Sequence, residues 1–165
     1  MRRTWGLRGQ TPLLVHNARR DRRVSAIGAI TISPVRRHLR SYVGLHPNVS
    51  IKQPEIIAFL RDQLRHRRGD LIVVWDRLNV HRGKKVKAYV AKHARIHLEE
   101  LPPYAPELNP VEAMWCHGKG HKLANYCPDS VDELAETAEE KFSDYQGEED
   151  LLKSFIRKTE LPLRL

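Results

Sequence analysis

The run from Leu71 to Asp76 (LIVVWD) constrains the fold of this chain more than any other segment. Five consecutive apolar residues followed by an acid are typical of a central strand that is buried on both faces and whose carboxyl end reaches solvent. Open α/β sheets hold their ligand sites at that end of their strands. The run therefore predicts an α/β sheet with Asp76 at its functional edge. An acid that only closes the turn after the strand is the alternative.

Two further segments have the composition of strands. Val24 to Ser33 (VSAIGAITIS) is apolar at nearly every position and β-branched at several, as in a buried strand, and Pro34 ends it. Arg37 to Val43 alternates apolar and polar residues like a half-exposed strand. We expect these two strands to form a hairpin and to share one sheet with Leu71 to Trp75.

Helical spacing of apolar residues marks most of the remaining chain, apart from a short strand expected at Ile96 to Leu98. Ser130 and Glu133 have the spacing of a capping box at the start of one helix. A hairpin followed by alternating helices and strands describes an α/β domain with a mixed sheet. Helices are expected from Pro54 to Arg68, after Gly83 through Val90, from Pro110 onward, from Ser130 to Tyr145, and through Leu151 to Ile156.

The chain has the size of one domain and an excess of positive charge. Its 165 residues include 29 Lys and Arg against 20 Asp and Glu, a formal net charge of +9. Such an excess is typical of proteins that bind a polyanion, although an Arg-rich surface that only keeps the protein in solution gives the same composition. Two cysteines imply no disulfide framework, and we expect a cytoplasmic protein without a signal peptide or a membrane partner.

Glu112 is the second acid of interest, and 35 residues separate it from Asp76. In one interpretation the two carboxylates share a divalent ion such as magnesium, as in enzymes of phosphoryl transfer. In the other, Asn109 caps a helix that starts at Pro110, and the Glu112 carboxylate reaches back to the backbone of the cap. The spacing does not choose between them.

Basic residues follow Asp76 closely in the sequence, at Arg82, Lys84, Lys85 and Lys87. Side chains in this place are suited to hold DNA phosphates beside the acid. A solvated helix face has the same composition. Both interpretations stay open.

Four residues of types suited to zinc occur after Glu112, at Cys116, His117, His121 and Cys127. Their spacing matches no zinc motif, and cysteines in a helical context are usually small buried side chains. We therefore expect no zinc site there.

Long stretches of the chain resemble the bacterial insertion-sequence branch of the mariner-like DDE transposases. They are VVWDRLNVHRG (Val73 to Gly83), HLEELPPYAPELNPVEAMW (His97 to Trp115) and LANYCP (Leu123 to Pro128). Upstream, RRTWGLRGQTP (Arg2 to Pro12) and RRVSAIGAITISP (Arg22 to Pro34) are similar to the same family. A match of this length is far more selective than a pair of acids.

This resemblance implies a ribonuclease H-like fold, a mixed sheet flanked by helices, in which three carboxylates hold two Mg or Mn ions. One ion activates a water or a DNA 3′-hydroxyl, and the other stabilises the leaving oxygen. Asp76 matches the second acid and Glu112 the third. The implied function is DNA transposition by strand cleavage and strand transfer. The implied partners are transposon ends, target DNA, and a second copy or an intact transposase, in the bacterial nucleoid.

The resemblance also implies a part that is missing. In the family the first acid lies on an opening strand, upstream of the segment that resembles Arg2 to Pro12. Asp21 is a poor substitute, because four arginines flank it in a polar turn. We therefore expect residues 1–165 to be one catalytic domain that is incomplete at its N-terminus, lacks the first strand, holds at most one ion weakly and is inactive alone. A non-catalytic, nucleic-acid-binding transposase remnant is the alternative.

Gly118 and Gly120 are a second departure, since they fall where the helix from Pro110 should continue. Each glycine inside a helix costs about 0.5 to 1 kcal/mol relative to alanine. Decay of an unused gene and a genuine helix end both explain them.

Overall fold

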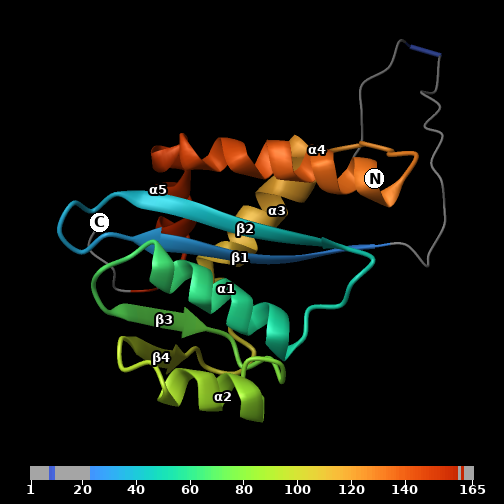
Figure 1. Cartoon of the computed structure of the whole chain (residues 1–165). Coiled ribbons are helices and arrows are strands. Elements are labelled where there is room, and N and C mark those ends of the chain that lie inside the picture. Colours follow the sequence, from blue (N-terminus) through green and yellow to red (C-terminus); the bar gives the residue numbers. More distant parts are fainter. Residues whose placement is uncertain (1–7, 10–22, 160, 162–165) are drawn as a thin grey trace.

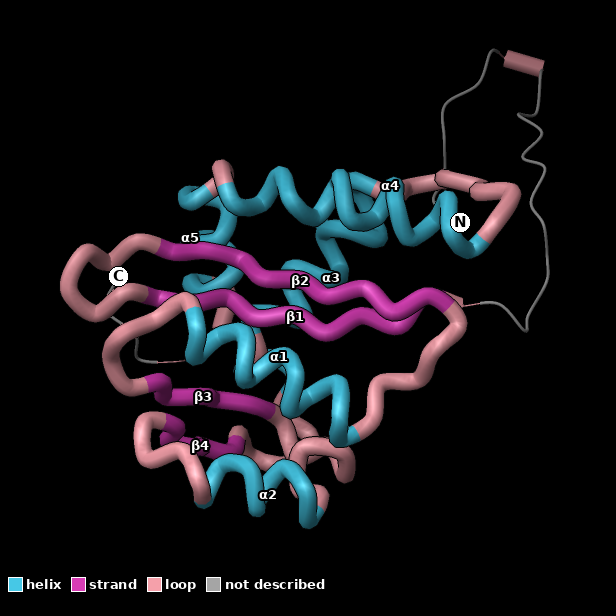
Figure 2. Tube along the Cα trace, in the orientation of Figure 1, coloured by secondary structure: helices cyan, strands magenta, loops and turns pink. Residues whose placement is uncertain are grey.

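The computed structural model describes residues 8–9, 23–159 and 161 and has an α/β fold (Figure 1; Figure 2). Asp21 and the segment from Arg2 to Pro12, except residues 8–9, lie outside the described residues. The strands are β1 (Val24–Ile32), β2 (Leu39–Pro47), β3 (Leu71–Trp75) and β4 (Ile96–Glu100). The α-helices are α1 (Gln53–Arg65), α2 (Lys84–Ala91), α3 (Pro110–His117), α4 (Val131–Ser143) and α5 (Glu149–Arg157).

Strands β1 and β2 form the expected antiparallel hairpin, paired from Val24 with Pro47 to Ile32 with Leu39. The second strand begins two residues later than the sequence predicts and extends further. Residues 34–38 form the turn, in which the Arg37 N–H donates to the Ser33 carbonyl at 2.9 Å. Within this turn, Arg37 adopts a left-handed backbone conformation with φ of 53°.

The prediction that β3 shares a sheet with the hairpin is wrong. Among the described residues, β3 pairs only with β4, in parallel, and the two pairs form separate two-stranded sheets. Side chains of α1 join them instead, because Ile56 and Leu60 pack against Ile27 of β1 and Val73 of β3. The sheets therefore share a hydrophobic core but no backbone hydrogen bonds.

The expectation that β3 is buried on both faces is also wrong. One face carries Val73 and Trp75, which pack against α1 and α2. The opposite face carries Ile72 and Val74, whose exposed fractions are 68% and 53%. Only one face of this parallel pair is covered by helices of the described residues, and the apolar run reflects both faces without showing which is covered.

The hairpin is covered on both faces, by α1 on one and by α3, α4 and α5 on the other (Figure 1). Alternate residues point to opposite faces of a strand, and accordingly Ile27 packs toward α1 whereas Ile30 packs toward α3 to α5. The core between the hairpin and α3 to α5 is built around aromatic and aliphatic side chains that are almost fully buried. They are Leu39, Met114, Phe142, Tyr145, Leu152, Phe155 and Ile156.

The helices begin where local capping chemistry predicts. Ser130 caps α4, since its Oγ accepts the Glu133 N–H at 3.0 Å. The Glu133 carboxylate does not complete the capping box at Ser130 but accepts from the Asp129 N–H at 2.8 Å and from the Tyr126 hydroxyl at 2.7 Å. Both bonds, that of Tyr126 first, lower the pKa of Glu133. Within the described part of the chain, no helix has the length and apolarity to cross a membrane.

The helix that contains Glu112 does not stop at the glycines. Helix α3 continues as a π-helical turn, η2 (Gly118–Lys122), in which the Leu123 N–H donates to the Gly118 carbonyl at 2.9 Å. Gly118 is buried, and a Cβ placed on it would lie 2.5 Å from the Phe142 ring. Gly118 thus permits close approach between η2 and α4, and it needs no explanation from gene decay.

This close approach predicts that Gly118→Ala destabilises the protein. Alanine normally stabilises a helical position relative to glycine, whereas overpacking a filled core costs about 1 to 3 kcal/mol. We expect urea denaturation to show a lower free energy of unfolding for this variant. Gly69→Ala is the control, because a Cβ at Gly69 meets no atom within 4 Å. Equal stability of the two variants would contradict the packing role.

Candidate metal and nucleic-acid site

The carboxyl ends of β3 and β4 lie side by side, because the strands are parallel and Trp75 is paired with Glu100. The Leu101 N–H donates to the Trp75 carbonyl at 2.9 Å and extends this pairing. Asp76 follows Trp75 directly. The expected position of Asp76, at the carboxyl end of an apolar strand, is confirmed.

The Asp76 carboxylate is held through one of its two oxygens. Oδ1 accepts from the Leu78 N–H at 3.1 Å and lies 2.9 Å from Nδ1 of His81. The same nitrogen lies 3.2 Å from the Asp76 carbonyl oxygen. Both neighbours are acceptors, so Nδ1 of His81 carries the hydrogen. Among the described residues, Oδ2 has no partner, and the side chain of Asp76 is 39% exposed.

His81 is itself fixed by stacking on Trp75. The ring centroids are 4.6 Å apart and the planes differ by 7°. Only 16% of the His81 side chain is exposed. A half-buried strand residue thus fixes a loop histidine, which in turn orients the Asp76 carboxylate. The sequence analysis did not predict the bond between His81 and Asp76.

Glu100 is a further residue that the sequence analysis missed. Its carboxylate lies 3.2 Å from Nε of Arg77 and 3.4 Å from Nε of Arg82. Glu100 therefore holds two guanidinium groups near the carboxyl edge where Asp76 lies. A signal was present in the sequence, since an acid at the end of β4 must lie beside the end of β3 in a parallel pair.

The predicted phosphate-binding residues lie on α2 and just before it. Val86 is fully buried and fixes the helix against the core. Lys84, Lys85 and Lys87 are exposed, and no ion pair within the described residues engages them. Arg82 differs, because its guanidinium is held by Glu100. The lysines are thus the freer cations of the predicted set.

The Glu112 carboxylate does not form a capping box. Asn109 caps α3 with its side chain, which accepts the Val111 N–H at 3.1 Å, while its own N–H donates to the Pro106 carbonyl at 3.0 Å. Glu112 lies in the first turn and is exposed, with no hydrogen bond or ion pair to its carboxylate among the described residues. The cap by Asn109 and the helix start at Pro110 are therefore confirmed, whereas the expected bond from Glu112 back to the cap is wrong, and this carboxylate is available for another role.

The described residues contain no cluster of three or more His, Cys, Asp or Glu side chains that could hold a metal ion. This finding concerns groups of at least three side chains and does not test a pair, so the sharing of an ion by Asp76 and Glu112 stays a prediction. Their oxygens are nevertheless the donors that magnesium and manganese prefer, and each has at least one oxygen without a partner among these residues.

The histidines after Glu112 belong to a buried polar contact. Nδ1 of His117 lies 2.7 Å from the hydroxyl of Tyr145, and its ring stacks on that of His121 at 4.7 Å. Burial raises the pKa of Tyr145 to about 12, helped by the charges of Glu148 and Asp144. Burial also lowers the pKa of His117, and the charge of His121 adds to this. The neighbouring Cys116 is exposed.

The sequence matches a known protein family over most of its length. Residues 1–135 match the family described as DDE superfamily endonuclease. The chain belongs to this family. Among curated proteins, none matches the chain. Membership indicates transposase-type DNA cleavage, binding to DNA and use of divalent metals, and the matched residues include Asp76, Glu112 and the whole of α2.

The environment of His117 predicts a pH-dependent stability. Its folded pKa lies below the ordinary value of 6.5, so below that pH the unfolded chain binds more protons and unfolding is favoured. Stability from this group is present above pH 6.5 and lost as pH falls through the folded pKa. The charged groups that face it are His121, Lys122, Glu148 and Lys158.

We therefore expect His117→Gln, which retains a donor for Tyr145, to lose less stability than the parent between pH 8 and pH 5.5. The free energy of unfolding from urea titrations at both values measures this. An identical loss in parent and variant would contradict the assignment.

Proposed function

We propose that the chain is the catalytic domain of a mariner-like insertion-sequence transposase, which cleaves DNA strands and transfers them with a ribonuclease H-like fold. Asp76 and Glu112 are the proposed metal ligands. The observation that carries the proposal is the fixed Asp76 carboxylate, with Oδ1 held by His81 and Leu78 and Oδ2 without a described partner, in a chain of the DDE endonuclease family.

The residues around the edge have roles that follow from their chemistry. His81 holds the Asp76 carboxylate in one orientation, so that its other oxygen stays available. The lysines of α2 provide positive charge for the phosphates on either side of the scissile bond. Glu100 restrains Arg77 and Arg82 at the same edge. When bound, Mg or Mn ions supply an activated water or 3′-hydroxyl and stabilise the leaving oxygen.

A third carboxylate is required for two ions, and we propose that it comes from outside residues 23–159. Among the described residues, β1 is paired only with β2 and β3 only with β4, which leaves one edge of each without a partner. A strand that paired with both would join the two sheets and would bring an acid beside Asp76. This arrangement fits the opening strand that the family resemblance implies.

It follows that the 165-residue chain alone holds at most one ion weakly and does not cleave DNA. The second candidate function is a non-catalytic DNA-binding remnant that pairs with an intact transposase or a second copy in the bacterial nucleoid. The net charge of +9 and the separation of the two carboxylates from any larger ligand cluster favour it. In both proposals residues 1–165 act as one domain.

Cleavage assays distinguish these functions. The chain as given is compared with a version extended upstream by a strand bearing Asp, each with Mg or Mn and a linear duplex. We expect cleavage only in the extended version, and its loss with Asp76→Asn or Glu112→Gln. Asp70→Asn, at the other end of β3, is the matched control and should leave cleavage intact.

Two other results of the cleavage assays would change the proposal. Cleavage by the unextended chain that Asp76→Asn abolishes would show that its ligand set is already complete. Absence of cleavage in every version would favour the binding remnant.

DNA binding provides an independent prediction. We expect binding without sequence preference that weakens steeply with salt, because phosphate contacts release counterions. Replacement of Lys84, Lys85 and Lys87 by glutamine should weaken the salt dependence. The magnitude of the negative slope of log K, the association constant, against log salt should fall by about 2 to 3. Fluorescence anisotropy at several KCl concentrations measures this. A strong preference for one sequence, or binding that does not depend on salt, would contradict it.

A further inference from the structure

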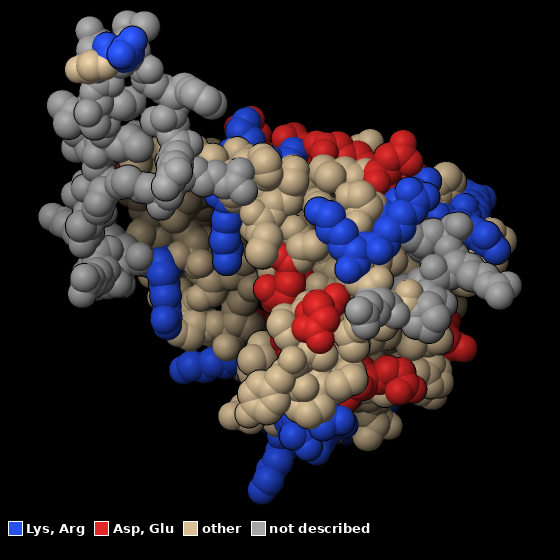
Figure 3. All heavy atoms as spheres, turned by 180° about the vertical axis from the view of Figure 1, so that it is seen from behind, with Lys and Arg blue, Asp and Glu red and all other residues tan. Residues whose placement is uncertain are grey.

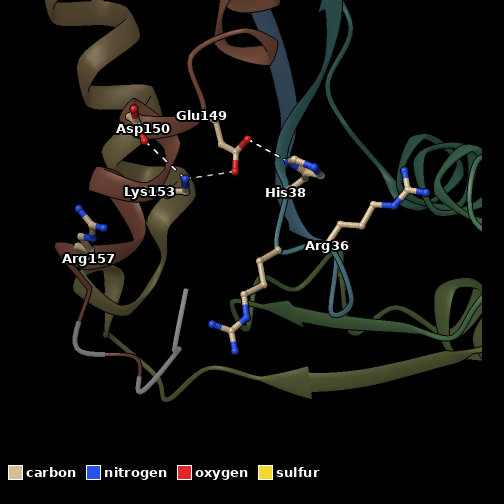
Figure 4. A pocket seen from close by; sticks show the side chains of 7 residues that line it. Arg36, His38, Glu149, Asp150, Lys153 and Arg157 are labelled. Atoms are coloured by element: carbon tan, nitrogen blue, oxygen red, sulfur yellow. Dashed lines mark hydrogen bonds and ion pairs between the residues drawn. The ribbon is translucent and has the colours of Figure 1, made fainter.

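A second basic site lies between the β1–β2 turn and α5, where a pocket of about 440 Å³ opens to the surface (Figure 4). Lys153 and Glu149 on α5 face His38 at the end of the turn. The pocket includes cations from both elements. It is lined by Arg36, Arg37, His38, Glu149, Asp150, Lys153 and Arg157.

The two acids of the pocket are already engaged. One oxygen of Glu149 lies 3.2 Å from Nδ1 of His38, and the other lies 3.3 Å from Nζ of Lys153. Asp150 lies 3.5 Å from the same ammonium group. The hydrogen bond from His38, followed by that from Lys153, lowers the pKa of Glu149, so this acid stays ionised.

Three arginines of the pocket remain without an ion pair to any described residue, namely Arg36, Arg37 and Arg157. All three are exposed. With Lys153 there are four Lys and Arg against two acids, an excess of two positive charges while His38 is neutral. Guanidinium groups match phosphate oxygens in a bidentate manner, so this arrangement favours a phosphate ligand.

Hydrogen bonds fix the backbone of the turn that carries Arg36 and Arg37. The turn is closed by the Ser33 N–H donating to the His38 carbonyl at 3.0 Å, and the Arg36 N–H points to the Ser33 hydroxyl at 3.3 Å. Arg37 occupies a left-handed conformation that glycine or asparagine would adopt more easily. On the other side, Phe155 is buried in the core and anchors α5.

The pocket lies away from the Asp76 edge. In Figure 1 the β1–β2 turn and α5 lie at the left, whereas the arrow of β3 points to the right, toward Asp76. Figure 3 shows the molecule from behind, so that the left side of Figure 1 lies at the right. Lys and Arg side chains gather there, below the acidic side chains at the top. Helix α5 also lies beyond residues 1–135, the part that matches the family.

We propose that this pocket binds successive phosphates of the DNA backbone and is a second anchor for the DNA that the Asp76 edge cleaves. The inference rests on the proposed function for the identity of the ligand. An open site with guanidinium groups from two elements suits a passing phosphate chain better than one enclosed ion. On this proposal the substrate is a DNA long enough to extend past the Asp76 edge to the far end of the domain.

The first experiment compares two triple variants of the full chain with equal loss of charge. Arg36, Arg37 and Arg157 are replaced by glutamine in one, and Arg61, Arg65 and Arg68, exposed residues on or just after α1, in the other. We expect the pocket variant to bind a 30-bp duplex at least about tenfold more weakly, with a salt slope smaller by about 2 to 3. The α1 variant should change the slope by less than about 1.

A second experiment predicts a gain of affinity, which misfolding does not explain. Asp150→Asn removes a negative charge from the pocket and should tighten duplex binding about twofold to threefold. Asp132→Asn is the matched control, because both residues are exposed aspartates in the first turn of a helix. We expect no tightening for the control variant.

Inorganic phosphate, titrated into the same proteins by calorimetry at constant ionic strength, separates a DNA anchor from a small-anion site. Tight phosphate binding that the pocket variant loses, with unchanged duplex affinity, would overturn the proposal. So would equal effects of the two triple variants. If the extended version cleaves DNA in a manner that depends on Asp76 while the pocket variant binds DNA normally, this inference is overturned and the proposed function stays intact.

Discussion

The packing of α1 between the two sheets is the interaction on which the rest of the described structure depends. Ile56 and Leu60 are almost fully buried, and they contact the hairpin through Ile27 and the parallel pair through Val73. Burial of each such side chain contributes about 1.5 to 3 kcal/mol. Since no backbone ladder links the sheets among the described residues, the position of β3 relative to the hairpin is set by this helix. The Asp76 edge is therefore positioned by side-chain packing.

At the Asp76 edge, a chain of contacts leads from the core to the surface. Trp75 belongs to the core around α1, stacks on His81 and so fixes the hydrogen bond to Asp76. At the neighbouring strand end, Glu100 holds two arginines by exposed ion pairs, which contribute little to stability individually. The orientation of the carboxylate thus depends on a partly buried ring stack, and that of the arginines depends on surface ion pairs. A change of salt concentration should therefore affect the positions of the two arginines more than that of the Asp76 carboxylate.

Local chemistry in the sequence predicts the helices and the hairpin well, because caps and turns depend on neighbouring residues. Ser130 starts α4 and Pro34 ends β1 as expected. The sheet assignment failed because an apolar run indicates burial without naming the neighbouring strand, and Ile72 and Val74 prove exposed. The partners of Asp76, Leu78 and His81, are local, whereas its neighbour on the next strand depends on the same long-range information. Glu100 reaches the edge only through the register that pairs it with Trp75.

The π-helical turn after α3 affects how the chain is compared with its relatives. In an α-helix each N–H donates to the carbonyl four residues earlier, whereas here Leu123 donates to Gly118, five residues earlier. The turn therefore contains one residue more than a regular helix of the same length. A relative with a regular helix here needs a one-residue alignment gap within residues 118–122. A gap placed further along would pair His121 and Lys122 with the wrong positions and hide their equivalents.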